Sequence, residues 1–132
     1  MTSIPTVAAE LVSAISKFAD QPAMSDYART IAYRRLGQFV SELAGSLAKP
    51  QVVGIFGSPG VTMGASCVAC VIYGCPFVHL DPAMPQMVLH NIVSELNVRL
   101  IVTCEKAAPG QLPGDCETVD ANALLDNTSA PY

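Results

Sequence analysis

The chain has 132 residues, of which 51% are hydrophobic and 14% charged, and its formal net charge is −4. This length suits one domain with a modest core, and the apolar composition favours buried parallel strands or a large interface. The acidic balance argues against nucleic acid as a partner, and no apolar run approaches the roughly 20 residues of a membrane-spanning helix, so we expect neither nucleic acid nor a membrane.

The first element predicted is an amphipathic helix with Pro5 in an early helical position. Its apolar side chains recur at helical spacing on one face, at Val7, Leu11, Ile15 and Phe18. The first 21 residues have no basic segment ahead of these apolar residues and include Glu10 among them, unlike a secretory signal. We therefore expect a cytoplasmic protein.

A β-hairpin and a second helix are predicted next. The runs QPAMSD and RTIAYRRL, residues 21–26 and 29–36, alternate in polarity on either side of Tyr27 and Ala28, which is typical of two paired strands. The second arm leads into a helix that ends at the sequence KPQ. The apolar stripe of this helix consists of Leu36, Val40, Leu43 and Leu47.

Residues 51–104 are predicted to form a strand–helix–strand–helix–strand series. The strands are the apolar runs at 52–57, 76–80 and 99–104, and the helices cover 61–73 and 85–96. The second helix carries its apolar residues at Met87, Ile92 and Leu96. Short connections between alternating strands and helices indicate parallel strands joined by right-handed crossovers, so we predict an α/β fold with a parallel sheet and flanking helices.

Residues 105–132 are predicted to be a loop-rich tail, partly disordered, because prolines and glycines interrupt them. A short strand at Thr118–Val119 and a weak helical turn are the regular elements expected there. The chain as a whole, 1–132, is then one α/β subdomain: helix, hairpin and helix over 1–50, the sheet series over 51–104, and the tail over 105–132.

The five cysteines are an odd number and are expected to be reduced thiols. Cys67 and Cys70, in the sequence CVAC, have the spacing of a redox or zinc motif. They lie inside an apolar helical pattern, however, whereas a redox pair begins a helix, and no second pair follows at a matching distance. We favour buried side chains that act as small hydrophobic residues.

The turn from Gly54 to Gly64 lies where a parallel sheet would bind a dinucleotide or phosphate, with Asp81 in the position of a ribose-binding acid. Its spacing is G-x-x-G-x-x-G, which differs from the dinucleotide fingerprint, and Pro59 removes one N–H donor. The chain has no Gly-Lys-Ser/Thr. Nucleotide binding by this turn alone is the minor interpretation.

His79 and Asp81 fall on one face of the second predicted strand, as an oriented general base would. No nucleophile accompanies them, since Ser58 and Ser66 lie in no elbow motif and His90 belongs to a helical stripe. The alternative is that Asp81 turns the chain ahead of the next helix, in a direction set by the prolines around it. We favour the turn and assign no catalytic, cofactor-binding or metal-binding residue.

Three segments, in matching order and spacing, resemble adenylate-forming enzymes, which include acyl- and aryl-CoA synthetases, luciferase-type enzymes and the adenylation domains of nonribosomal peptide synthetases. IAYRRL at residues 31–36 is similar to the family's early motif L-T-Y-x-E-L, but Ala32 and Arg35 depart from it. SELNVRLIVT at 94–103 resembles ADAGARLVVT. Between them, VIYGCPFVHLDPAMP at 71–85 is similar to L-K-A-G-x-A-Y-V-P-L-D-P-x-Y-P. It matches at Gly74, Val78, Leu80, Asp81, Pro82 and Pro85, and differs at Ile72, Tyr73, Pro76, Phe77, His79 and Met84.

The resemblance, which covers the chain from Gln21 onward, implies the N-terminal α/β subdomain of this fold. It makes residues 71–85 a strand-to-helix joint in which His79 takes a proline position and has no catalytic role. It also implies that the loop holding the ATP phosphates, a Thr/Ser/Gly-rich stretch ending in Pro-Lys-Gly, begins just after Tyr132. In the complete enzyme, ATP and Mg²⁺ are used to join a carboxylic acid to AMP, and a phosphopantetheine thiol of a carrier protein then takes the acyl group.

The sequence therefore predicts a truncated adenylation domain that is a ligase in its complete form, is inactive alone and binds no cofactor itself. The remaining subdomains, a second chain or a second copy would cover an apolar face. Two alternatives from other classes stay open. One is a noncatalytic docking or dimerisation module in a biosynthetic assembly line, and the other is a small nucleotide-binding domain that uses the turn at Gly54–Gly64.

Overall fold

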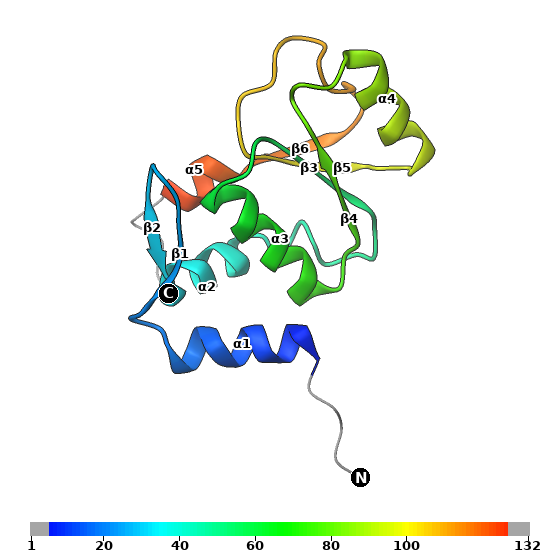
Figure 1. The fold of residues 1–132 in the computed structure, drawn as a ribbon. Helices are drawn as coiled ribbons and strands as arrows, with labels where there is room; N and C mark the ends of the chain where they lie inside the picture. The colour runs from blue at the N-terminus through cyan, green and yellow to red at the C-terminus, as the bar shows by residue number, and fades with distance from the viewer. Residues whose placement is uncertain (1–5, 127–132) are drawn as a thin grey trace.

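A four-stranded parallel sheet lies at the centre of the computed structural model, which describes residues 6–126 (Figure 1). Its strands are β3 (Val53–Phe56), β4 (Phe77–Leu80), β5 (Leu100–Thr103) and β6 (Glu117–Asp120). Their order is β4-β3-β5-β6, and every neighbouring pair is parallel. The predicted α/β fold is confirmed. All four residues of β3 are buried, because it has a strand on each side and helices over both faces.

Helices cover the two faces of the sheet unequally. On one side lie α2 (Tyr33–Glu42), α3 (Val61–Tyr73) and the short α5 (Ala121–Asp126), with α1 (Val7–Lys17) packed outside them (Figure 1). On the other side lies α4 (Gln86–Glu95). The side chains of β3 alternate accordingly: Val53 and Ile55 join the larger apolar cluster, whereas Phe56 joins the smaller one beneath α4.

The predicted hairpin is confirmed as β1 (Pro22–Ser25) and β2 (Thr30–Ala32), which pair antiparallel and lead directly into α2. The apolar stripe of the second helix is also confirmed, because all four of its predicted side chains are buried. The helix itself is shorter than predicted. Regular α2 ends at Glu42, and the chain continues through turns in which the Leu47 N–H still donates to the Leu43 carbonyl at 3.0 Å.

The predicted apolar stripe of α1 is confirmed in part. Ile15 is buried and Leu11 half-buried, whereas Val7 is 68% exposed and Phe18, just after the helix, 37% exposed, because this helix rests on the outer surface of α2 and α3. In α4 the buried residues are Leu89 and Val93, whereas Met87 is 75% and Leu96 45% exposed. In α4, helical spacing alone identified Ile92, which packs against the smaller cluster, but missed Leu89 and Val93. The early position of Pro5 lies outside the described residues.

The described part of the predicted tail belongs to the fold. The expected strand at Thr118–Val119 is the middle of β6, which continues the sheet beside β5, and the weak helical turn is α5. Ala121 and Leu125 of α5 are buried in the larger cluster. Residues 127–132, the end of the tail, lie outside the described range. Within residues 6–126, no helix is both long enough and apolar enough to cross a membrane.

The left-handed conformation at the end of α3 can be tested by substitution. Gly74 takes the left-handed conformation, with φ +72° and ψ +24°, and its N–H donates to the Cys70 and Val71 carbonyls. We expect Gly74→Ala to lower the unfolding free energy by about 1 kcal/mol, because a Cβ strains this conformation. Urea denaturation measures the change. Gly45→Ala is the control: its Cβ meets open space and its φ is not left-handed, so a loss of similar size there would contradict the assignment.

Candidate functional site

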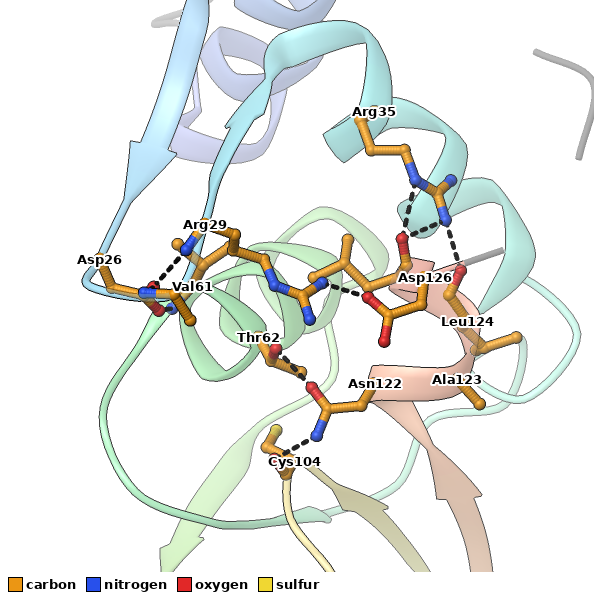
Figure 2. Close-up of polar contacts among 12 residues, drawn as sticks. Asp26, Arg29, Arg35, Val61, Thr62, Cys104, Asn122, Ala123, Leu124 and Asp126 are labelled. Carbon is orange, nitrogen blue, oxygen red and sulfur yellow. Dashed lines mark hydrogen bonds and ion pairs between the residues drawn. The ribbon is translucent and has the colours of Figure 1, made fainter. Parts of the chain in front are cut away.

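Polar groups gather where the parallel strands end, the edge at which open α/β sheets bind ligands (Figure 2). The β3–α3 turn, the segment after β5 and the start of α5 meet there, together with the turn of the β1–β2 hairpin. We call this set the polar network and define it by five side chains: Asp26, Arg29, Arg35, Thr62 and Asn122.

The β3–α3 turn contains two glycines with specific steric roles. Gly57 has φ +152°, and a Cβ there would lie 2.8 Å from the Cβ of Cys104, so the ends of β3 and β5 approach closely only with glycine at this position. A Cβ at Gly60 would lie 2.9 Å from the Oδ2 of Asp26. Both glycines are explained by contacts within the chain.

Carboxylates of the chain itself occupy the N–H groups of this turn. The Ser58 N–H donates to Glu105 Oε1 at 2.8 Å, and the Val61 N–H donates to Asp26 Oδ2 at 2.6 Å. Pro59 has no N–H to offer. The anion that a helix N-terminus favours is therefore already supplied by Asp26. Two donors of the candidate phosphate turn are thus already used within the fold, which weighs against the nucleotide-binding interpretation.

Asp26 also closes the hairpin turn. Its Oδ1 accepts from the N–H groups of Ala28 at 2.7 Å and Arg29 at 3.0 Å. The hydrogen bond from Val61, followed by those from Arg29 and Ala28, lowers the pKa of Asp26 below its usual value. One carboxylate thus joins the hairpin to the start of α3, two elements that lie 35 residues apart.

Asn122 holds the first turn of α5 in place. Its Nδ2 donates to the Cys104 carbonyl at 2.7 Å, and its Oδ1 accepts from Thr62 Oγ1 at 2.7 Å. Asp120 caps the same helix, since its Oδ1 accepts from the Ala123 N–H at 3.1 Å. The start of α5 is therefore tied to both α3 and the end of β5 by hydrogen bonds from an amide side chain (Figure 2).

Two arginines hold the last turn of α5 (Figure 2). Arg29 pairs with Asp126 at 2.6 Å. Arg35, on α2, donates from Nε and Nη2 to the Leu125 carbonyl at 3.0 and 2.7 Å, and from Nη2 to the Leu124 carbonyl as well. These are carbonyls that the end of a helix leaves without an intrahelical partner. A guanidinium there also interacts favourably with the helix dipole.

The structure gives His79 and Asp81 separate local partners. His79 Nε2 lies 2.7 Å from the Gly57 carbonyl. Asp81 Oδ1 accepts from the Ala83 N–H at 2.9 Å, and the Asp81 carbonyl accepts from Met84. The prediction that Asp81 turns the chain ahead of α4 is confirmed. His90 is likewise engaged locally, with its Nε2 3.0 Å from the Gly110 carbonyl.

The five cysteines are all free thiols, and none begins a helix. Cys70 is buried within α3, as predicted, while Cys67 is half-buried. Burial raises the pKa of Cys70 to about 12 and that of Cys104 to about 11, so both remain protonated and poorly nucleophilic at neutral pH. Among residues 6–126, no group of three or more His, Cys, Asp or Glu side chains is arranged to hold a metal ion.

An open cleft of about 730 Å³ lies beside the polar network, between the loop after β5 and strand β6. Its charged lining consists of Glu105, Lys106 and Asp120. Glu105 is engaged by the Ser58 N–H and Asp120 by the Ala123 N–H. The cleft is therefore lined by charges of both signs, and its two carboxylates accept hydrogen bonds from backbone N–H groups of the fold.

Sequence reasoning missed the residues that organise this edge: Asp26, Arg35 and Asn122. Their partners lie 35, 89 to 90, and 18 to 60 residues away along the chain, so no local spacing links them. One of these residues could have been noticed in the sequence, because Arg35 replaces the glutamate of the early motif L-T-Y-x-E-L.

The family described as AMP-binding enzyme matches residues 11–131 of the chain. The N-terminal subdomain of Klebsiella oxytoca NpsA is 20% identical with a TM-score of 0.71, and the match covers 98% of this chain and 35% of that one. Holo-AB3403, a four-domain nonribosomal peptide synthetase bound to AMP and glycine, is 23% identical with a TM-score of 0.75, over 96% of this chain and 9% of that one.

PA1221, an NRPS protein containing adenylation and PCP domains, is 19% identical with a TM-score of 0.71, over 96% of this chain and 26% of that one. The chain thus spans 35% or less of the length of these three structures. No curated protein gives a significant match.

The hydrogen bonds of Asp26 predict a pH-dependent contribution to stability. A carboxyl group whose pKa is lowered by folding stabilises the native state fully above its unfolded pKa of about 4, and this contribution is lost as the pH falls through the native pKa. We expect Asp26→Asn to be less stable than the unmodified chain at pH 7, with the difference shrinking below about pH 4. Denaturant unfolding across this range measures it.

Asp115→Asn, at an exposed position, controls for the loss of one negative charge. A difference between the Asp26→Asn variant and the unmodified chain that stays constant from pH 7 to pH 2.5, roughly the span over which carboxyl groups titrate, would contradict the assignment.

Proposed function

Because the chain belongs to the family of AMP-binding enzymes, we propose that it is the N-terminal α/β part of an adenylation domain of the nonribosomal peptide synthetase type. The observation that carries this proposal is the family match over residues 11–131. The parallel sheet between two helical layers, shared with NpsA, AB3403 and PA1221, supports the narrower class.

The complete form would activate an amino or aryl/acyl acid in two steps. A carboxylate oxygen of the acid attacks the α-phosphorus of ATP, so that pyrophosphate leaves and an acyl adenylate forms. The thiol of a phosphopantetheine carrier then attacks the acyl carbon, and AMP leaves. Both steps depend on positioning of the reactants and on positive charge placed around the phosphates.

The described residues do not fit ATP or Mg²⁺ at the edge of the sheet. Two N–H groups of the β3–α3 turn are used by Asp26 and Glu105, and the cleft beside it presents two carboxylates against one lysine. Residues 6–126 also offer no acidic or histidine cluster that could hold a metal. We therefore propose that this chain holds neither group by itself and is inactive alone.

The proposed role of this chain is to provide a scaffold for the parts that carry the chemistry. Exposed apolar side chains on β4, on α4 and just after α4, namely Phe77, Met87, Val88 and Leu96, support an interaction with the remaining subdomains or with a second chain. The solved structures that it resembles include proteins with adenylation and PCP domains, which supports a carrier protein as a partner of the complete form. We propose a cytoplasmic location for it.

The exposed face of α1 favours a second candidate function. Val7 and Val12 are 68% and 52% exposed, so a noncatalytic docking or dimerisation module in an assembly line is the alternative. A small nucleotide-binding domain is less well supported, because Asp26 and Glu105 already use two donors of the glycine turn.

ATP–pyrophosphate exchange with a panel of amino and aryl acids tests the proposal. We expect no exchange from this chain alone, and exchange when it is mixed with a polypeptide from the same genome that carries the remaining adenylation-domain segments. Gly54→Val is the matched control, because even one added carbon at Gly54 meets Leu80 Cδ1 at 2.8 Å and should prevent correct packing of β3.

Exchange by the isolated chain would contradict the scaffold role. Calorimetry with ATP separates the remaining alternatives, since binding by the isolated chain favours the nucleotide-binding domain. Failure of the mixture to exchange, together with a dimer seen by light scattering, favours the docking module.

A further inference from the structure

Arg35 lies between two competing partners, the end of α5 and Glu42 on its own helix. Three of its N–H contacts go to the Leu124 and Leu125 carbonyls, and Nη1 donates to Gln38 Oε1 at 3.1 Å. Only 16% of the arginine side chain is exposed. In this arrangement the guanidinium faces α5 with most of its donors (Figure 2).

Glu42 makes one long ion-pair contact with Arg35 and no hydrogen bond. Its Oε1 lies 3.6 Å from Arg35 Nη1, which is close enough for an ion pair but too far for a good hydrogen bond. Both carboxylate oxygens are buried and have no hydrogen-bond partner among the described residues. A buried carboxylate without hydrogen bonds is costly, so Glu42 would gain from closer contact with the guanidinium that α5 now occupies.

The two ends of α5 are held by different interactions. Its first turn is fixed by neutral hydrogen bonds from Asn122 and by the burial of Ala121. Its last turn is held by the buried side chain of Leu125, by Arg35 and by the Arg29–Asp126 pair, in which Asp126 is 59% exposed and the ion pair is correspondingly weak. Arg35 therefore provides the main polar contact of the last turn.

We propose that Arg35 is a positioning residue that exchanges between the α5 carbonyls and Glu42, so that Glu42 makes the docking of the last turn of α5 reversible. Glu42 thus competes with α5 for Arg35, whereas a supporting ion-pair partner would hold Arg35 in place on α5.

Hydrogen exchange of the α5 amides in the 132-residue chain distinguishes these roles by sign. We expect Glu42→Gln to slow exchange at residues 124–126 by roughly threefold, because a neutral amide competes less well for Arg35. Arg35→Met should accelerate it by roughly tenfold, since it removes charge-assisted hydrogen bonds. Arg35→Lys should restore part of the protection, because one donor still reaches the carbonyls.

The double variant Arg35→Met, Glu42→Gln is the decisive measurement. If Glu42 acts only through Arg35, the double variant exchanges at the rate of Arg35→Met alone, a clear departure from additivity. Glu95→Gln and Lys17→Met remove the same charges on α4 and α1 and should leave α5 unchanged. The amides of α3 report whether each variant is folded and whether global stability has shifted.

Faster exchange at 124–126 in Glu42→Gln, or no change there, would overturn the proposal, because Glu42 would then support Arg35 or have no effect on it. A slowing of equal size in α3 would also overturn it, since the effect would be global. The measurement needs neither ATP nor a carrier, so its outcome is independent of whether the proposed adenylation reaction is correct.

Discussion

The burial of β3 is the constraint on which the fold depends. β4 and β5 pair with β3 in parallel, and each parallel pairing requires the intervening chain to cross over a face of the sheet. Ile55 and Phe56 point to opposite faces and join separate apolar clusters. The burial of this one strand therefore requires helices on both faces, α3 on one and α4 on the other.

The central position of β3 brings the carboxyl ends of the strands together. At that edge, charged side chains of the protein bind its own backbone groups. Asp26 occupies the start of α3, Glu105 takes a further N–H of the same turn, and Arg35 covers the end of α5. Several backbone groups at this edge, including two N–H groups of the β3–α3 turn and two carbonyls of α5, thus have a side chain of the same protein as their partner. These internal contacts favour the proposed scaffold role over a binding role for this edge.

Local patterns predicted those elements in which burial follows a simple period. The apolar run of β3, the hairpin and the stripe from Leu36 to Leu47 were all found, because each is buried on a face that alternation or helical spacing reveals. Met87 and Leu96 were assigned to the wrong face of α4, because several stripes of that short helix are apolar. Strand β6 was reduced to two residues, since three of its four side chains are exposed and show little pattern.

The sequence by itself determined the α/β class, the parallel strand series and the family resemblance, because these depend on residues that are close together along the chain. It also identified Asp81 as a turn residue, since an aspartate bonds to backbone two residues ahead. Only the tertiary structure decided the partners of Asp26, Arg35 and Asn122. The physical reason is that a charged or amide side chain can satisfy any backbone group that the fold brings within 3 Å, roughly one hydrogen-bond length, and sequence separation places no limit on that choice.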